Sequence, residues 1–252
     1  MLNRCLACLP NVLVLSEVNP LGCGGDQPGP PETDIQRQAR EWFGLDPKGT
    51  SFSEVIGDLC RQAAARQHQL IVRDWTYVNF FPSELNGNNP PYRFLTREEL
   101  ERINGEEDGN ASSNDPSDLK VFALTRDAID VWISRNTPPA TEFFPHYLRY
   151  AERLVAENIP RFKYEAFCAS PGRALQDICR ATGLPYDESW RSFPTYTNVY
   201  GDSHPGKKSR GFSEAEIISL PRKKIGLLKV KEVNACAEMV EANRLLGYPA
   251  EY

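Results

Sequence analysis

Short apolar segments alternate with helical patterns along this chain, and the alternation limits the folds that it can adopt. Apolar segments with β-branched residues predict buried strands at Val12–Leu15, Leu70–Val72 and Val121–Leu124, and the less apolar segment Arg161–Tyr164 predicts a fourth. Apolar residues spaced three to four apart predict helices at Ile35–Phe43, Phe52–Gln67, Ala128–Ser134, His146–Glu157 and Ala174–Thr182. Because a helix that connects two strands favours parallel pairing, we expect an α/β fold with a mainly parallel sheet and helices on both faces.

Length and loop composition predict how the chain is organised. With 252 residues it can bury one large core, so we expect a single domain over residues 1–252. Gly22–Pro31 and Asn104–Ser117 are rich in turn residues and predict loops, the second of them within a mobile acidic insertion at 86–117. Residues 213–252 are expected to form a C-terminal helical segment.

The charge of the chain argues against several classes of partner. Its net charge of −5 disfavours nucleic-acid binding. The charge is uneven, since Pro205–Glu232 holds eight Lys and Arg against three Glu, and a local basic site on an acidic protein suits a small anion. No apolar run approaches the roughly 18 residues of a membrane span, and the N-terminal apolar run is too short for a secretory signal. We therefore expect a cytoplasmic protein with no membrane partner.

Cysteine and histidine usage gives little support for a metal site. The seven cysteines are odd in number, which favours a reduced compartment over a full disulfide framework. Cys5 and Cys8 form one close pair, whose spacing suits zinc or redox chemistry, or two small apolar residues on an N-terminal helix. No second Cys/His pair is near them in the sequence, so we expect no metal.

Polar residues directly follow three of the predicted strands. They are Ser16-Glu17, Arg73-Asp74 and Thr125-Arg126-Asp127. Ligands of open parallel sheets bind beyond the carboxyl ends of the strands, so we expect the three clusters to meet at one rim. Each cluster also has a structural interpretation, because an Arg-Asp pair at a strand end can be a local ion pair or the start of a helix cap.

The segment from Val121 to Ser134 carries the most specific signal. Its strand delivers Arg126 to the rim, and Ser134 follows eight residues later, about two helical turns along, so both can contact one phosphate. The segment resembles the 3′-phosphate-binding motif of sulfotransferases, in which a strand ends in Arg-Asp and a helix supplies a serine eight residues on. This resemblance implies a three-layer α/β/α fold of the P-loop NTPase-like type, with 3′-phosphoadenosine 5′-phosphosulfate as co-substrate.

Other segments resemble the same family, in the same order, over about Leu2 to Phe212. Leu9–Pro20 is similar to the second strand and its acidic end, and Arg161–Glu165 to a later strand that ends in Tyr-Glu. Ser170–Tyr186 is similar to the helix that follows, and Lys207–Phe212 to the basic loop that closes over the nucleotide.

The resemblance implies roles for individual nucleotide-binding residues. Arg126 and Ser134 would bind the 3′-phosphate, through a charged fork and a hydroxyl donor. Tyr164 would contact the nucleotide, although a buried core tyrosine also fits that position. The closing loop, or alternatively a solvated basic turn, would contain Lys207, Ser209 and Arg210.

The resemblance also suggests a catalytic base, and it implies an N-terminal segment that this sequence does not contain. Glu17 stands where some members keep a catalytic glutamate that takes the proton from the acceptor hydroxyl; alternatively it pairs with Arg73 or Arg126. Met1–Ala7 is similar to the helix just after the loop that cradles the 5′-phosphosulfate, and that loop is not in this sequence. We expect either an in-frame upstream extension of roughly 10 to 20 residues or a degenerate member.

The leading hypothesis is therefore sulfuryl transfer to a hydroxyl or amine of a small-molecule or carbohydrate acceptor. A catalytically impaired nucleotide-binding protein is the first alternative. A nucleotide kinase is the second, and it requires a Gly-x-x-x-x-Gly-Lys-Ser/Thr loop that this sequence does not contain. The acceptor is not readable, because the aromatic residues that could stack on it could equally pack within their loop; they are Trp75, Tyr77, Phe80 and Phe81.

Overall fold

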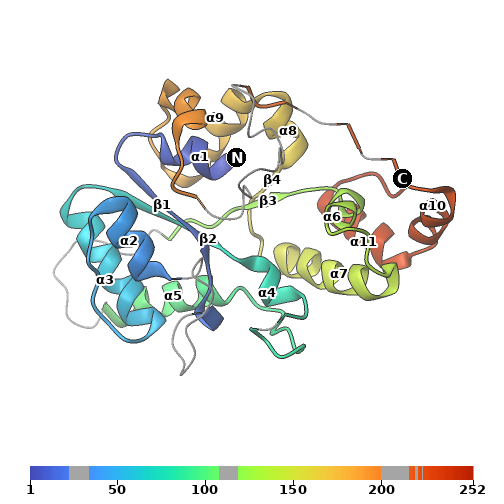
Figure 1. Ribbon diagram of the computed structural model, residues 1–252, viewed down its shortest axis with the longest axis horizontal. Coiled ribbons are helices and arrows are strands. Elements are labelled where there is room, and N and C mark those ends of the chain that lie inside the picture. Colours follow the sequence, from blue (N-terminus) through green and yellow to red (C-terminus); the bar gives the residue numbers. More distant parts are fainter. Residues whose placement is uncertain are drawn as a thin grey trace. The chain divides into compact units, whose positions relative to one another are not determined.

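The computed structural model describes residues 1–22, 34–83, 85–107, 119–199, 216–218, 221–222 and 224–251 (Figure 1). The chain folds into two compact units, each built from three separate stretches of sequence. Unit 1 comprises Met1–Thr76, Phe94–Lys120 and Leu175–Glu216. Unit 2 comprises Tyr77–Arg93, Val121–Ala174 and Ile217–Tyr252. The expectation of a single domain stays a prediction.

Each unit contains one pair of parallel strands. In unit 1, β1 (Val12–Val18) pairs with β2 (Gln69–Asp74), and in unit 2, β3 (Ala123–Thr125) pairs with β4 (Arg161–Lys163). The four predicted strands and their parallel direction are confirmed. Within the described residues the strands form two two-stranded sheets, so the α/β class is confirmed at this level.

The core of unit 1 forms where two amphipathic helices cover the β1–β2 pair. Helices α2 (Ile35–Phe43) and α3 (Phe52–Ala65) lie alongside these strands (Figure 1). Both helices were predicted from their apolar spacing, and the structure confirms them. The buried core residues are Leu15, Val18, Ile35, Ala39, Leu45, Phe52, Val55, Ile56 and Leu59.

Local capping residues set the ends of these two helices. Asp34 accepts a hydrogen bond from the Arg37 backbone N–H at 2.8 Å and starts α2. Gly44 ends α2 in the left-handed region at φ 59°, which favours glycine. Ser51 and Glu54 form a reciprocal capping box at the start of α3.

Helix α5 (Leu95–Glu107) lies where the sequence predicts a loop, and the prediction of a loop throughout 86–117 is wrong for this stretch. Charged side chains pair along the helix, Arg97 with Glu101 at 2.7 Å and Arg102 with Glu99 at 2.9 Å. Leu100 and Ile103 pack against the core of unit 1. The acidic composition therefore belongs, up to Glu107, to a helix. Residues 108–118 lie outside the described part.

The N-terminal segment of unit 1 forms α1 (Leu2–Ala7), as the sequence predicts. It packs against β1 and against the 3₁₀ helix η3 (Glu188–Thr195). Cys5 is fully buried in α1, which supports the apolar interpretation of this cysteine. The cysteines within the described residues are free. Two further elements are η1 (Pro20–Gly22) and α9 (Pro171–Thr182).

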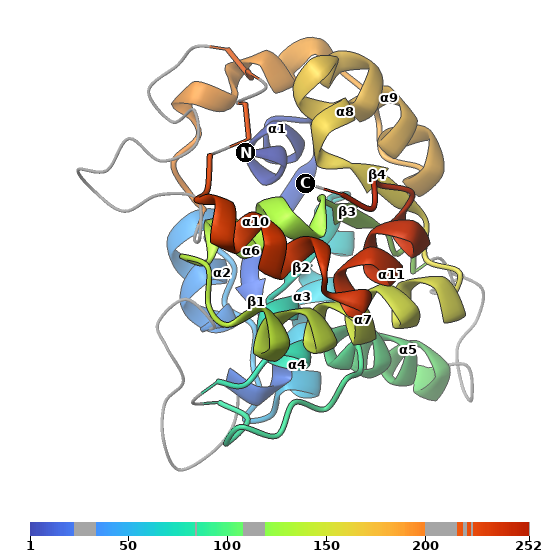
Figure 2. The ribbon, with the colours of Figure 1, turned by 90° about the vertical axis from the view of Figure 1, so that its right-hand side faces the viewer.

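The helices of unit 2 come from distant parts of the sequence. Helix α11 lies against α7 and α6, and α10 precedes it (Figure 2). The two C-terminal helices confirm the helical character expected after residue 213, over the residues described there. The bounds are α4 (Thr76–Phe80), α6 (Ala128–Ser134), α7 (Ala140–Ala156), α8 (Tyr164–Ala169), α10 (Leu227–Asn234) and α11 (Ala237–Leu246). No helix in the described ranges combines the length and apolar character needed to cross a membrane.

Aromatic side chains fill the interior of unit 2 around α7. The helix starts six residues before the predicted His146 and contains Pro145, which does not interrupt it. Tyr77 and Phe81 stack at 4.8 Å between ring centroids, and Phe81 packs on Phe143 at 5.0 Å. Two of the loop aromatics considered as acceptor contacts are thus engaged in packing within the unit.

Candidate functional site

The β1–β2 pair is irregular near its carboxyl end. Regular pairing stops at Leu15 and resumes at Val18, so Ser16 and Glu17 together face the single residue Arg73. The extra residue is a β-bulge, and Glu17 accommodates it in the left-handed region at φ 58°. Such a conformation is strained for a glutamate, and strained residues of this kind cluster at functional sites.

The bulge brings the Glu17 carboxylate to the Arg73 guanidinium. Glu17 Oε1 and Arg73 Nη2 lie 2.8 Å apart, and the Glu17 side chain is 12% exposed. The pairing with Arg73 that the sequence left open is therefore observed. The role of Glu17 as a general base stays a prediction.

Asp74, the last residue of β2, is a fixed hydrogen-bond acceptor. Its Oδ1 accepts from Asn19 Nδ2 at 3.1 Å and from Thr96 Oγ1 at 2.7 Å, and both donors are buried. These bonds tie the end of β1 and the start of α5 to β2. They hold the Arg73-Asp74 end of the strand in place beside Glu17.

In unit 2, the end of β3 brings together two of the residues predicted to bind nucleotide. The Arg126 guanidinium carbon lies 5.1 Å from the centre of the Tyr164 ring, in a cation–π contact. Arg126 Nη2 lies 3.9 Å from Asp130 Oδ2, at the outer limit of an ion pair. Its Nε is buried and has no hydrogen-bond partner within the described part of the chain. Arg126 therefore keeps donor capacity for a further acceptor.

The backbone at Arg126 is held by a buried tyrosine. The Tyr147 hydroxyl donates to the Arg126 carbonyl at 2.6 Å. Burial raises the pKa of Tyr147 well above its usual value, so this hydroxyl stays a donor. This hydrogen bond holds in place the backbone from which the Arg126 side chain extends.

Two carboxylates stand at the start of α6, next to Arg126. Asp127 caps the helix by accepting from the Ile129 backbone N–H at 2.9 Å. Arg222 binds both carboxylates, with Nη2 2.6 Å from Asp127 Oδ2 and Nε 2.9 Å from Asp130 Oδ1. Sequence reasoning missed Arg222, because 92 residues separate it from Asp130.

Ser134 lies at the other end of the same helix. It is the last residue of α6, and its hydroxyl donates to the Val131 carbonyl at 2.6 Å. Asp130 stands midway in sequence between Arg126 and Ser134, four residues from each. Arg126 precedes the N-cap of α6, whereas Asp130 and Ser134 are four residues apart within the helix and share one of its faces. To donate to a phosphate, the Ser134 hydroxyl must leave its backbone partner.

The C-terminal residues add further groups to the end of β3. The Tyr248 hydroxyl donates to the Thr125 carbonyl at 3.0 Å and lies 2.9 Å from Glu165 Oε2. Burial raises the pKa of Tyr248, which keeps its proton in place. No local pattern announces these contacts, since 123 residues separate Tyr248 from Thr125.

Three predicted nucleotide-binding residues lie outside the described part of the chain. They are Lys207, Ser209 and Arg210. Glu17 belongs to unit 1, whereas Arg126, Ser134 and Tyr164 belong to unit 2. The convergence of the three strand-end clusters at one rim stays a prediction.

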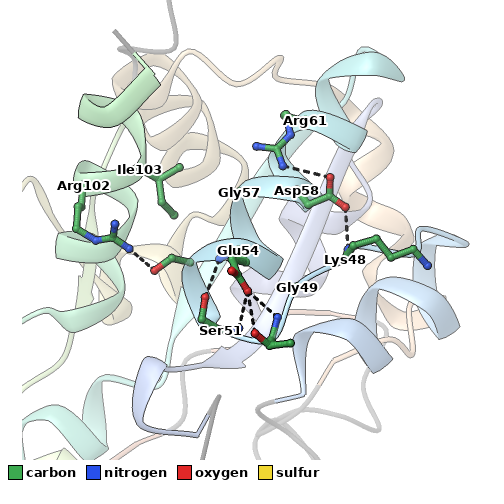
Figure 3. A pocket seen from close by; sticks show the side chains of 11 residues that line it. Lys48, Gly49, Ser51, Glu54, Gly57, Asp58, Arg61, Arg102 and Ile103 are labelled. Atoms are coloured by element: carbon green, nitrogen blue, oxygen red, sulfur yellow. Dashed lines mark hydrogen bonds and ion pairs between the residues drawn. The ribbon is translucent and has the colours of Figure 1, made fainter. Parts of the chain in front are cut away.

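A cavity of about 780 Å³ lies elsewhere in unit 1, around the start of α3 (Figure 3). None of the residues predicted for the nucleotide site lines it. Asp58, which lines it, pairs with Arg61 at 3.3 Å and accepts a hydrogen bond from the Lys48 backbone N–H at 2.8 Å.

The donors at the end of β3 suit an anionic ligand, with Arg126 as the principal cation and the Tyr164 ring beneath it. Within the described residues, no group of three or more His, Cys, Asp or Glu side chains could hold a metal ion. Comparisons of the chain with protein-family models, curated proteins and solved structures found no match.

Proposed function

We propose that this chain is a sulfotransferase that uses 3′-phosphoadenosine 5′-phosphosulfate, built on a three-layer α/β/α fold of the P-loop NTPase-like type. The observation that carries the proposal is the set of contacts that the Arg126 side chain makes. Its guanidinium rests on Tyr164, its ion pair with Asp130 is long, and its buried Nε is unmatched within the described residues. A phosphate would supply the missing acceptors.

The proposed reaction is an in-line displacement at sulfur. A hydroxyl or amine of the acceptor attacks the sulfur, and the bond between the sulfur and the 5′-phosphate oxygen breaks. Adenosine 3′,5′-bisphosphate leaves with the electrons of that bond. The Glu17 carboxylate takes the proton that the acceptor loses, while Arg73 orients the carboxylate through their 2.8 Å contact.

The contact between Glu17 and Arg73 also favours a second function, which is nucleotide binding without catalysis. The Glu17 carboxylate is already engaged with a guanidinium, which is the arrangement of a structural ion pair. The two functions share the site at Arg126. They differ in whether the acceptor is sulfated.

Calorimetric titration with adenosine 3′,5′-bisphosphate tests the shared site. We expect Arg126→Ala to weaken binding by about 2–5 kcal/mol, because the 3′-phosphate loses a charged partner in a partly desolvated site. Adenosine 5′-monophosphate lacks that phosphate, so its affinity should change little in the same variant. Arg149→Ala is the control, since Arg149 is an exposed arginine of the same unit. Equal affinities of wild type and Arg126→Ala for the bisphosphate would reject the proposal.

A further inference from the structure

Two carboxylates, those of Asp127 and Asp130, follow Arg126, the arginine on which the proposed phosphate site depends. The Asp127 side chain is 4% exposed and the Asp130 side chain 14%. Asp130 lies 3.9 Å from Arg126 and shares a face of α6 with Ser134, which follows it by four residues. A free carboxylate there would repel a phosphate and compete with it for Arg126.

Arg222 forms ion pairs with both carboxylates, Asp127 and Asp130. Its guanidinium spans them, with 2.6 Å from Nη2 to Asp127 and 2.9 Å from Nε to Asp130. Its side chain is 27% exposed, so solvent only partly screens the pairing. Asp130 thus has a much closer cation than Arg126, whose Nη2 is 3.9 Å away.

The consequence for Arg126 follows from this difference in distance. Asp130 Oδ1 is bound to Arg222, and the longer contact from Arg126 goes to the other oxygen. Charge-assisted hydrogen bonds are strong at about 2.7–2.9 Å, so the tighter pair is the one with Arg222. The guanidinium of Arg126 is left to stack on Tyr164 with donors to spare.

We propose that Arg222 is a positioning residue for anion binding at Arg126. It neutralises Asp127 and Asp130, and so keeps Asp130 from capturing Arg126 and from repelling the incoming phosphate. This inference rests on the proposed function, because it assumes that the anion is the 3′-phosphate of the nucleotide. Arg222 itself need not touch the nucleotide.

The test is a double-mutant cycle on Arg222 and Asp130, read by calorimetric titration of the full chain with adenosine 3′,5′-bisphosphate. We expect Arg222→Gln to weaken binding about tenfold, within the range of coupling between residues that are in contact. The Arg222→Gln/Asp130→Asn double variant should bind within about threefold of wild type, because Asp130, the carboxylate that lies 3.9 Å from Arg126, can no longer compete for it. Arg244→Gln is the matched control, since Arg244 pairs with Glu241 on the exposed surface of the same unit.

The cycle separates positioning from a merely structural role. If Arg222 only stabilised the fold, the double variant would bind as weakly as Arg222→Gln, and the inference would fail. Should Arg222→Gln not fold, the comparison moves to Asp130→Asn with and without Arg222→Gln, whose affinities should agree within about threefold. A larger difference overturns the inference while the proposed function stands. Failure of wild type to bind the bisphosphate rejects both.

Discussion

The side-chain amide of Gln38 binds the backbone of Ser16 at both of its polar groups. The Ser16 N–H donates to Gln38 Oε1 at 2.8 Å, and Gln38 Nε2 donates to the Ser16 carbonyl at 2.8 Å. Gln38 is fully buried on α2 and pairs with β1 as a neighbouring strand would. The contact lies at the bulge that turns Glu17 toward Arg73, so it connects the core of unit 1 to the proposed base.

Replacing Gln38 by leucine should therefore destabilise the protein. The variant keeps a similar volume but removes two buried partners of the Ser16 backbone, and we expect a loss of roughly 2–4 kcal/mol in the free energy of unfolding. Urea unfolding followed by circular dichroism measures it. Gln36→Leu on the same helix is the control, with an expected loss below about 1 kcal/mol, because its longer bonds to loop carbonyls are partly exposed. Equal losses in the two variants would contradict this account of Gln38.

Replacing Glu17 by glutamine should separate catalysis from binding. A general base contributes about 10² to 10⁴ in rate, so turnover should fall by that order while the affinity for adenosine 3′,5′-bisphosphate stays near wild type. Transfer of labelled sulfate to phenol, hexose and alkylamine acceptors provides the assay, with Glu41→Gln on the exposed face of α2 as the control. Unchanged turnover in Glu17→Gln rules out the base role. Transfer to no acceptor by wild type favours nucleotide binding without catalysis.

The Tyr164 ring should contribute to nucleotide affinity through Arg126. Tyr164→Phe keeps the ring under the guanidinium and should bind adenosine 3′,5′-bisphosphate within about twofold of wild type, whereas Tyr164→Leu should bind about fivefold more weakly. Titration calorimetry on both variants measures the difference. If phenylalanine and leucine weakened binding equally, the hydroxyl rather than the ring would be the important group.

His146 should make the stability of the protein depend on pH. Its Nδ1 lies 2.8 Å from the Tyr92 hydroxyl, and burial lowers its pKa below 6.5, the ordinary value for histidine. Between its folded pKa and pH 6.5, His146 is therefore protonated to a greater extent in the unfolded chain than in the folded one. The contribution of His146 is fully present above pH 6.5 and is lost as the pH falls from there through the folded pKa.

Urea unfolding between about pH 5 and 7.5 tests this dependence. Wild type should lose stability toward low pH faster than His146→Gln does. His68→Gln is the matched control, a second histidine-to-glutamine change at a ring that lies 2.7 Å from the Arg66 carbonyl. Parallel curves for wild type and His146→Gln would contradict the prediction.

The sequence by itself determined the strands and several helices, because their signals are local. Apolar runs predicted β1 to β4, and three-to-four spacing predicted α2 and α6 with the bounds that the structure has. Asp34 and Gly44 bound α2 through neighbouring backbone groups alone. Arg126 directly follows β3 and Ser134 ends α6, so the eight-residue spacing between them lies within one short segment. This candidate pair could therefore be named without a structure.

The tertiary structure decided what those residues contact. Helix α5 was missed because its acidic composition is typical of loops. Its apolar residues Leu100 and Ile103 pack against the core of unit 1, a contact that the local sequence does not reveal. The bulge at Glu17 depends on the register between β1 and β2 and on Gln38, which local patterns do not encode. The Arg222 pairing joins groups 92 residues apart. Its energy comes from charges brought together in a partly desolvated place, and only the folded chain creates that place.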